Sequence, residues 1–381
     1  MSSTLSQRPV GARHDATIKH LRPTAVVYCE ANFGSADGKT ANGLVRHSER
    51  YEILSVIDST QAGLDTGAIL GDGPNRIPVV TDLPHAILRH GGVPDYLIFG
   101  MAPSSGMLSA AERALMLDAM DQGISLVNGL HEFLNDDPEF KAAAERNGVA
   151  ILDVRRPRDK KDLRMFSGRI DDVACVRIAV LGTDSAVGKR TTATILTKAL
   201  NERGIKTVMV GTGQTGLIQG ARYGVALDAL PCQFGSGEME AAVVDAYEGE
   251  HPQVIIIEGQ GALSHPAYLS STFILRGSKP HGVILQHAPA RVRLGDFANV
   301  PTPEPASEIN LLETFADTKV IGVTINHENM TDLEVTQAIA RYEHELSLPT
   351  TDALTRPVER LVDMVVHAFP EIEMTATAKA S

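Results

Sequence analysis

Short runs of apolar residues alternate with longer segments of helical periodicity along most of the chain. In the first half, such runs predict strands over 24–29, 52–57, 77–80, 96–99, 125–127 and 150–154. In the second half, fully apolar runs predict strands buried on both faces over 176–180, 207–210, 254–257, 282–285 and 320–325. Helices are predicted over 108–122, 193–200, 307–315 and 358–368. The alternation predicts an α/β fold with mostly parallel sheets.

The loop after the strand over 176–180 has the layout of a phosphate-binding P-loop. It runs from Gly182 to Lys189 and leads into a predicted helix. Backbone N–H groups in such a loop point at an anion, and the lysine adds a positive charge. Thr183 stands where the usual pattern has its first glycine, and Arg190 stands where a Ser or Thr normally binds Mg²⁺. The alternative is a glycine turn with an incidental surface lysine.

We expect this loop to hold the phosphates of a cofactor, without a metal site of the usual kind. The expected cofactor-binding residues are Thr183, Asp184, Ser185, Ala186, Val187, Gly188, Lys189, Arg190 and Thr191.

Length and charge predict two domains. The 381 residues exceed what one hydrophobic core usually supports. A segment rich in Lys and Arg over 155–168 forms a charged connection, which places the boundary near residue 172. We therefore expect a Rossmann-like domain over 21–172 and a P-loop NTPase-like, doubly wound domain over 173–371. The polar ends, 1–20 and 372–381, are expected to be a mobile arm and a flexible tail.

Composition limits the partners. A net charge of −12 argues against nucleic acid or an anionic membrane as the main partner, so an anionic ligand needs a local site. No apolar run reaches the length of a bilayer span, and the start lacks the apolar segment of a signal peptide. The three cysteines have no metal-ligand spacing. We expect a cytoplasmic homo-oligomer that acts on a small molecule.

Candidate site residues follow the predicted strands, because ligands of such sheets collect at the strands' C-terminal ends. Gly213, Gln214 and Thr215 follow the strand over 207–210 within a glycine-rich loop, which allows a ligand to approach the backbone closely or simply forms a tight turn. Gln260 follows the strand over 254–257 and is a further candidate for substrate binding.

Two residues compete for the role of general base. Glu258 directly follows four apolar residues, as the carboxylate of a Walker B element does, so it is expected to be partly desolvated; the alternative is a solvated strand end. His287 follows the strand over 282–285 and alternatively bonds only to local backbone.

The first half offers basic candidates. Lys39 lies at a predicted helix entrance, where it can hold a carboxylate or phosphate, or simply belong to a solvated loop. Arg155 and Arg156 open the charged connection. Asp58 stands where a Rossmann domain places its ribose acid, yet no G-x-G-x-x-G precedes it, so no dinucleotide site is predicted.

The P-loop over 182–189 together with Glu258-Gly259-Gln260-Gly261 resembles dethiobiotin synthetase and its relatives. A resemblance over nearly the whole chain rests on the segments 37–41, 56–59, 153–157, 182–184, 188–192, 211–216, 258–261 and 285–289. On these segments the chain is similar to a two-domain P-loop family once known only as a domain of unknown function. Its characterised branch is D-glutamate N-acetyltransferase, which uses acetyl-CoA.

The resemblance implies transfer of an acetyl group from acetyl-CoA to the amino group of an acidic amino acid, D-glutamate in the characterised branch. Lys189 and the loop amides would then hold CoA phosphate, and Arg190 suits direct phosphate binding. Glu258 or His287 would take a proton from the substrate ammonium. Arg155, Arg156 or Lys39 would hold the carboxylates.

Two other classes of function stay open. A Mg-ATP-dependent ligase or kinase of the dethiobiotin synthetase type would require Mg²⁺, with Thr191 or Thr192 replacing the missing ligand. A non-catalytic nucleotide-binding regulatory protein would bind its ligand tightly and form no product.

Overall fold

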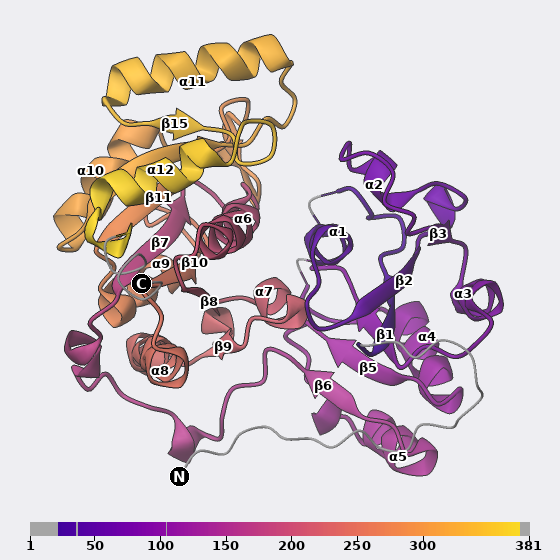
Figure 1. Ribbon diagram of the computed structural model, residues 1–381. Helices are drawn as coiled ribbons and strands as arrows, with labels where there is room; N and C mark the ends of the chain where they lie inside the picture. The colour runs from indigo at the N-terminus through magenta and orange to yellow at the C-terminus, as the bar shows by residue number, and fades with distance from the viewer. Residues whose placement is uncertain (1–21, 36, 104, 374–381) are drawn as a thin grey trace.

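The computed structural model describes residues 22–35, 37–103 and 105–373, which form two lobes, each built around a parallel sheet (Figure 1). The predicted α/β class is confirmed, with a Rossmann-like lobe first and a P-loop lobe second. The predicted arm and most of the predicted tail lie outside the described residues, whereas Ile372 is buried. The domain boundary near residue 172 stays a prediction.

The first lobe contains a six-stranded sheet in the order β3-β2-β1-β4-β5-β6, with every neighbouring pair parallel. This is the strand order of a Rossmann fold. Its strands are β1 (Thr24–Tyr28), β2 (Glu52–Ile57), β3 (Val79–Val80), β4 (Tyr96–Phe99), β5 (Ser125–Asn128) and β6 (Ile151–Asp153). Its helices are α1 (Lys39–Arg46), α2 (Thr66–Ile69), α3 (Leu83–His90), α4 (Ala110–Asp121) and α5 (Pro138–Asn147).

The second lobe contains a seven-stranded parallel sheet in the order β15-β14-β11-β7-β10-β8-β9. Its strands are β7 (Val176–Gly182), β8 (Thr207–Gly211), β9 (Tyr223–Gly224), β10 (Val254–Glu258), β11 (Gly282–His287), β14 (Lys319–Ile325) and β15 (Thr350–Thr351). Its helices are α6 (Lys189–Glu202), α7 (Gln214–Gln219), α8 (Cys232–Glu250), α9 (Ser270–Ser278), α10 (Pro305–Phe315), α11 (Asp332–Leu346) and α12 (Glu359–Ala368). A separate antiparallel hairpin joins β12 (Arg293–Leu294) to β13 (Phe297–Pro301).

The central strand β7 is apolar on both faces because helices cover both sides of its sheet. Ala179 and Leu181 enter a core cluster with residues of α8 and α9, while Ile178 and Val180 enter a second cluster with residues of α6 and α12. Alternating side chains therefore serve two hydrophobic layers, which is why the sequence shows a continuous apolar run.

Helix α7 joins the two lobes and lies beside α1 (Figure 1). Ile218 of α7 is fully buried in the hydrophobic core of the first lobe. Gln219 donates its side-chain amide to the carbonyls of Gly43 and His47, both at 2.7 Å, at the C-terminal end of α1. Thr215 shares a hydrogen bond of 2.9 Å with Thr40. The P-loop lobe thus supplies part of the first lobe's core and caps one of its helices.

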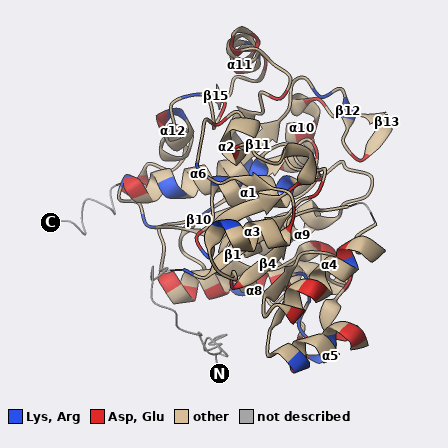
Figure 2. Ribbon diagram, turned by 90° about the vertical axis from the view of Figure 1, so that its right-hand side faces the viewer, with Lys and Arg blue, Asp and Glu red and all other residues tan. Residues whose placement is uncertain are grey.

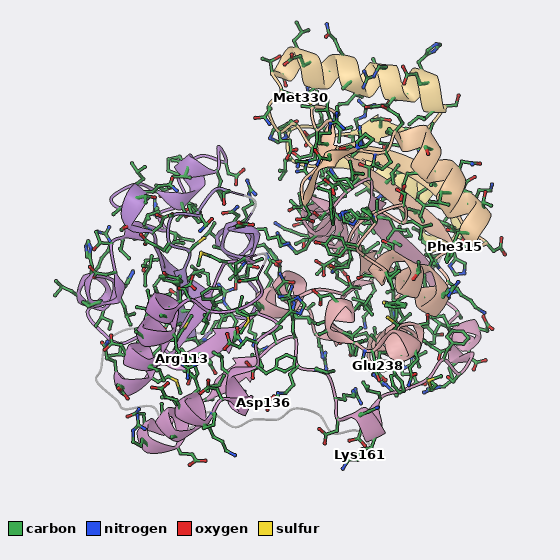
Figure 3. All side chains as sticks on the ribbon, turned by 180° about the vertical axis from the view of Figure 1, so that it is seen from behind. Arg113, Asp136, Lys161, Glu238, Phe315 and Met330 are labelled. Carbon is green, nitrogen blue, oxygen red and sulfur yellow. The ribbon has the colours of Figure 1, made fainter. Side chains whose placement is uncertain are left out.

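The charged connection is anchored to the second lobe. Arg164 donates to the buried carboxylate of Glu238 on α8, at 2.6 Å from its backbone N–H and 3.1 Å from Nη2. Glu238 lies in the second lobe, and Lys161 lies below it on the segment that leads from the first lobe to the second (Figure 3). Helices α4 and α5 each carry both acidic and basic residues, so neither presents a single sign of charge (Figure 2). No helix among the described residues is long and apolar enough to cross a membrane.

Candidate functional site

The strand, loop and helix expected of a P-loop are present. The loop leaves β7 at Gly182 and enters α6 at Lys189. Gly188 and Ala186 have positive φ angles of 106° and 49°. A turn that contains residues in the left-handed conformation can direct successive backbone N–H groups toward one point. The free N–H groups at the N-terminus of the following helix add to them. This geometry fits a phosphate group.

The loop lysine is folded back on its own loop. Lys189 is only 5% exposed, and its Nζ donates to the backbone carbonyl of Asp184. Burial lowers the pKa of Lys189 to about 7. The positive charges of Lys39 and Arg291 also lower this pKa, whereas the negative charges of Asp184 and Glu258 raise it. A bound phosphate would supply the negative charge that favours the protonated form.

Asp184 is the centre of a buried network that fixes the loop. Its carboxylate accepts hydrogen bonds from the backbone of Ser185 at 2.7 Å and of Gly295 at 2.9 Å. Arg291 donates to the same carboxylate at 2.9 Å and to the carbonyl of Ser185 at 2.8 Å. Nε and Nη2 of Arg291 donate to the carboxylate of Glu328 at 2.8 and 2.9 Å. The sequence prediction omitted Arg291, although its position just after β11 was a signal for it.

His287 supports the first residue of the loop from behind. Its Nδ1 shares a hydrogen bond of 2.8 Å with the hydroxyl of Thr183. Burial lowers the pKa of His287 to about 4, helped by Arg341 and Arg291, so the ring is neutral at pH 7. The ring also packs edge-on against Tyr342, with centroids 5.5 Å apart. These contacts give His287 a role in holding Thr183.

Polar residues of β11 and β14 form a second layer beneath the loop. Gln286 Oε1 accepts from the hydroxyls of Thr192 at 2.6 Å and Thr324 at 2.5 Å. Asn326 donates to the carbonyl of Val187 at 3.1 Å. Both Gln286 and Asn326 lie at or just beyond strand ends, where site residues were expected.

Arg190 extends from the start of α6 to the junction between the lobes. Its Nη1 donates to Gln219 Oε1, and its guanidinium lies so close to Gly43 of α1 that a side chain there would collide with it. Burial lowers the pKa of Arg190, partly offset by the negative charge of Glu258. The guanidinium, only partly exposed, therefore links the P-loop helix to the first lobe; its phosphate contact stays a prediction.

Glu258 ends β10 and is buried, with 4% exposure. Its Oε2 accepts the backbone N–H of Thr212 at 3.0 Å, while its own carbonyl accepts the Thr212 hydroxyl at 2.8 Å. Burial raises the pKa of Glu258, against the opposing effects of Arg190, the N–H groups of Thr212 and Gly213, and Lys189. The carboxylate lies directly against Gly216, where a side chain would collide with Oε2. Glu258 is therefore desolvated as predicted and packed under the start of α7.

The glycine-rich segment around α7 serves the domain junction. Gln214 and Thr215 are buried, at 6% and 7% exposure, and Gln214 packs near Gly129 of the first lobe. Gln260 donates to the Thr212 hydroxyl at 3.0 Å and lies directly against Gly213. Their roles toward a substrate stay predictions, while their packing explains the small residues in this stretch.

The basic candidates of the first lobe lie in different surroundings. Lys39 begins α1 with an exposed side chain, and the surrounding protein and the charge of Arg155 lower its pKa. Arg155 is buried and ion-paired with Asp228 of the second lobe at 3.0 Å, and it also donates to the carbonyl of Gly129. Arg156 is directed elsewhere, since it pairs with Asp136 and packs over Phe133 at 5.0 Å. The structure thus brings Lys39 and Arg155 toward the junction of the lobes and leaves Arg156 on the outside of the first lobe.

Two regions of the chain match known family models. Residues 59–157 match a Rossmann-like domain of unknown function, DUF1611_N, and residues 164–362 match the P-loop domain DUF1611_C. The crystal structure of a DUF1611 family protein from Anabaena variabilis is similar to this fold, with a TM-score of 0.83 and 32% sequence identity. It covers 91% of this chain, and all of that protein is matched.

Two curated relatives carry an enzyme name. A D-glutamate N-acetyltransferase from Tritonibacter scottomollicae is 32% identical over 274 residues, covering 70% of this chain and 80% of the relative. A D-glutamate N-acetyltransferase from a Pseudoalteromonas species is 30% identical over 272 residues, covering 70% and 79%. Matches to both domain models, to a whole solved structure and to these relatives agree: the chain belongs to the DUF1611 family.

Proposed function

We propose that this protein is an N-acetyltransferase that moves an acetyl group from acetyl-CoA to the amino group of an acidic amino acid, D-glutamate being the first candidate. The names of two relatives at 30–32% identity support this class of reaction. The observation that carries the proposal is a P-loop with Arg190 in place of the Mg²⁺-binding Ser or Thr. Acetyl-CoA brings phosphates and a thioester, so its use requires a phosphate cradle without requiring a metal.

In this proposal Lys189 and the N–H groups of residues 186–189 hold phosphate oxygens, because the Ser185 N–H already donates to the Asp184 carboxylate. Lys189 must first release the Asp184 carbonyl, and the network around Asp184 keeps the loop in place while this happens. Arg291 fixes the loop by donating to the Ser185 carbonyl and to the Asp184 carboxylate. The other donors of its guanidinium are engaged with Glu328.

The acidic substrate needs cations for its carboxylates, and Lys39 fits this role better than the other candidates. Its side chain is exposed, whereas Arg155 is buried in an ion pair and Arg156 is engaged with Asp136. Lys39 also lies near enough to Lys189 to lower its pKa, so the two cations serve the same region. An acidic amino acid bound there would lie close to the phosphate site.

Attack on the thioester requires a neutral amine, so a base must remove a proton from the substrate ammonium. Glu258 is the stronger candidate, because burial raises the pKa of its carboxyl group. A carboxylate with a raised pKa is a stronger base toward the substrate ammonium. His287 is held against Thr183 and its pKa of about 4 makes it a weak base. We therefore assign the base to Glu258.

The test is mass spectrometry of incubations with acetyl-CoA and a panel of D- and L-amino acids, with and without Mg-ATP. The proposal expects an N-acetylated acidic amino acid and free CoA, in the absence of ATP. A product that forms only with Mg-ATP would support a ligase or kinase instead. Tight binding of CoA or ATP with no product under any condition would support a regulatory protein.

A further inference from the structure

His265, in the segment between β10 and α9, carries a buried ring nitrogen with no hydrogen-bond partner. Its side chain has 0% exposure, and Nε2 makes no hydrogen bond. Within the described ranges, the other buried side-chain atoms without a partner are hydroxyl oxygens, on Tyr51, Ser55, Thr302, Thr318 and Thr351. A hydroxyl can rotate toward weak partners, but a ring N–H points in one direction. An orphaned ring nitrogen beside a P-loop therefore calls for a ligand as its partner.

The other ring nitrogen fixes the position of the proton. Nδ1 lies 3.2 Å from the backbone N–H of Ala267, which can only donate, so Nδ1 must accept. A neutral imidazole whose Nδ1 accepts carries its hydrogen on Nε2. The unpartnered atom is thus a hydrogen-bond donor.

The surroundings keep this donor neutral and still. Burial lowers the pKa of His265, and Lys189 acts in the same direction against the carboxylates of Asp184 and Asp296. The ring stacks on Tyr268 with centroids 4.4 Å apart and planes 20° apart, and meets the edge of Phe297 at 5.6 Å.

The donor lies beside the P-loop without being used by it. Nε2 is 3.7 Å from Asp184 Oδ1, beyond hydrogen-bond distance. That carboxylate already accepts hydrogen bonds from Ser185, Arg291 and Gly295.

A covering layer separates the donor from solvent and is held down by hydrogen bonds near the surface. Tyr268 Oη and Ser185 Oγ both donate to Asp296 Oδ2, at 2.8 and 3.0 Å. Asp296 is an exposed residue of the β12–β13 hairpin, so these bonds form at the surface. Release of these bonds, together with the hydrogen bond from Gly295 to Asp184, would free the hairpin from the P-loop and uncover the His265 ring.

We propose that His265 Nε2–H is a catalytic hydrogen-bond donor to the acyl oxygen of the thioester, an inference that rests on the acetyl transfer proposed above. The amine nitrogen forms a bond to the acyl carbon, the C–S bond breaks, and the sulfur leaves as a thiolate. The first ammonium proton goes to Glu258, and the second, lost from the nitrogen as the amide forms, goes to the departing thiolate to give the CoA thiol. His265 transfers no proton and stabilises the negative charge that develops on the oxygen.

An acyl oxygen suits this position better than a phosphate oxygen. A single neutral N–H offers no countercharge for a permanent anion beside the Asp184 carboxylate, 3.7 Å from Nε2, and the ion pair of that carboxylate with Arg291 at 2.9 Å limits its repulsion of a charge that develops only briefly. A thioester oxygen is uncharged until the amine attacks, so the donor gains strength in the transition state, which is what accelerates a reaction. The loop amides and Lys189 serve the phosphates separately.

The test compares His265→Phe with His265→Gln. Phenylalanine keeps a ring that can stack on Tyr268, while glutamine restores an N–H donor at about the reach of Nε2. We expect His265→Phe to lower kcat about 10²–10³-fold, the usual effect of losing one such donor, with the Kd for CoA unchanged. His265→Gln should recover part of kcat, and the pH profile of kcat should keep its shape in both variants. Nitrogen chemical shifts of ¹⁵N-labelled protein should show the hydrogen on Nε2 in the wild type.

Each other outcome overturns the inference in a distinct way. An active wild type whose kcat is unchanged by His265→Phe refutes the donor and leaves the proposed function standing. A raised Kd for CoA with unchanged kcat assigns His265 to a phosphate. Loss of a limb of the pH profile makes it a base. A wild type that binds CoA but never transfers acetyl removes both proposals together, and a hydrogen found on Nδ1 removes the donor alone.

Discussion

Lys189 Nζ donates a hydrogen bond to the backbone carbonyl of Asp184, so the lysine of the P-loop occupies the inside of the loop that carries it. A phosphate must take over this hydrogen bond when it binds. The exchange is favourable because a buried ammonium gains more from an anion than from a carbonyl.

Lys189→Ala should therefore weaken binding of the phosphate-bearing cofactor at least tenfold, since a charged hydrogen bond contributes about 1.5–3 kcal/mol. Lys198→Ala is the matched control, because Lys198 lies on the same helix with its side chain 70% exposed. Calorimetric titration with CoA and with ATP measures both variants. Unchanged affinity of Lys189→Ala for both ligands would remove the P-loop from the site.

The same lysine makes the stability of the ligand-free protein depend on pH. In the unfolded chain its pKa is about 10.4, whereas burial lowers it to about 7 in the folded protein. Between these values the unfolded state binds more protons, so the contribution of Lys189 makes stability rise with pH. Lys189→Met should be more stable than the wild type at pH 7.5, and the difference should shrink toward pH 10. Urea unfolding at several pH values measures it, and a difference that stays constant would show that Lys189 does not titrate in this window.

Apolar runs predicted the long strands well, because a strand covered on both faces needs apolar residues at every position. The predicted strand over 254–257 is β10, and the one over 52–57 is β2 with the same bounds. The two-residue edge strands β9 and β15 and the hairpin β12–β13 were not predicted. Their residues are few or largely exposed, so burial left no pattern in the sequence.

The sequence predicted at which edge of the sheet the site residues lie, but not which side chains contact one another. Topology alone places Lys189, Glu258 and His287 at the carboxyl ends of neighbouring strands, and the structure has them there. The predicted topology could not show that Ile218 enters the core of the first lobe or that Arg155 pairs with Asp228, 73 residues away. Such contacts depend on how two folded lobes dock, for which one sequence holds no local signal.

Arg155 provides a test that separates docking from substrate binding. Its side chain is 8% exposed and pairs with Asp228, so Arg155→Met leaves a partly buried carboxylate without its cation. We expect a loss of up to about 3 kcal/mol in unfolding free energy, with the KM for the acidic substrate unchanged in the folded enzyme. Arg156→Met is the control, because an exposed pair contributes at most about 1 kcal/mol. A large rise in KM for Arg155→Met at intact stability would return Arg155 to the substrate.

Acetyl transfer should persist in EDTA. The residue after Lys189 is Arg190, whose guanidinium is engaged with Gln219 and cannot coordinate Mg²⁺. The rate of CoA release measured with and without chelator tests this expectation. Complete loss of transfer in EDTA that Mg²⁺ restores would favour the ATP-dependent class.

Glu258 and His287 can be separated by paired amide substitutions. Glu258→Gln keeps an oxygen that can accept the Thr212 N–H and removes the basicity, so the turn beneath α7 should keep its shape. If Glu258 is the base, kcat should fall roughly 10²–10⁴-fold while affinity for CoA stays nearly intact. Because the carboxylate must be ionised to accept a proton, kcat of the wild type should decline as pH falls through the raised pKa of Glu258, and this limb should be absent from Glu258→Gln.

His287→Gln should have a smaller effect on kcat, because His287 contacts Thr183 behind the loop. Steady-state kinetics over pH 5–9 for both variants decide the matter: full turnover by Glu258→Gln would make Glu258 structural, and a larger loss in His287→Gln would move the base to His287.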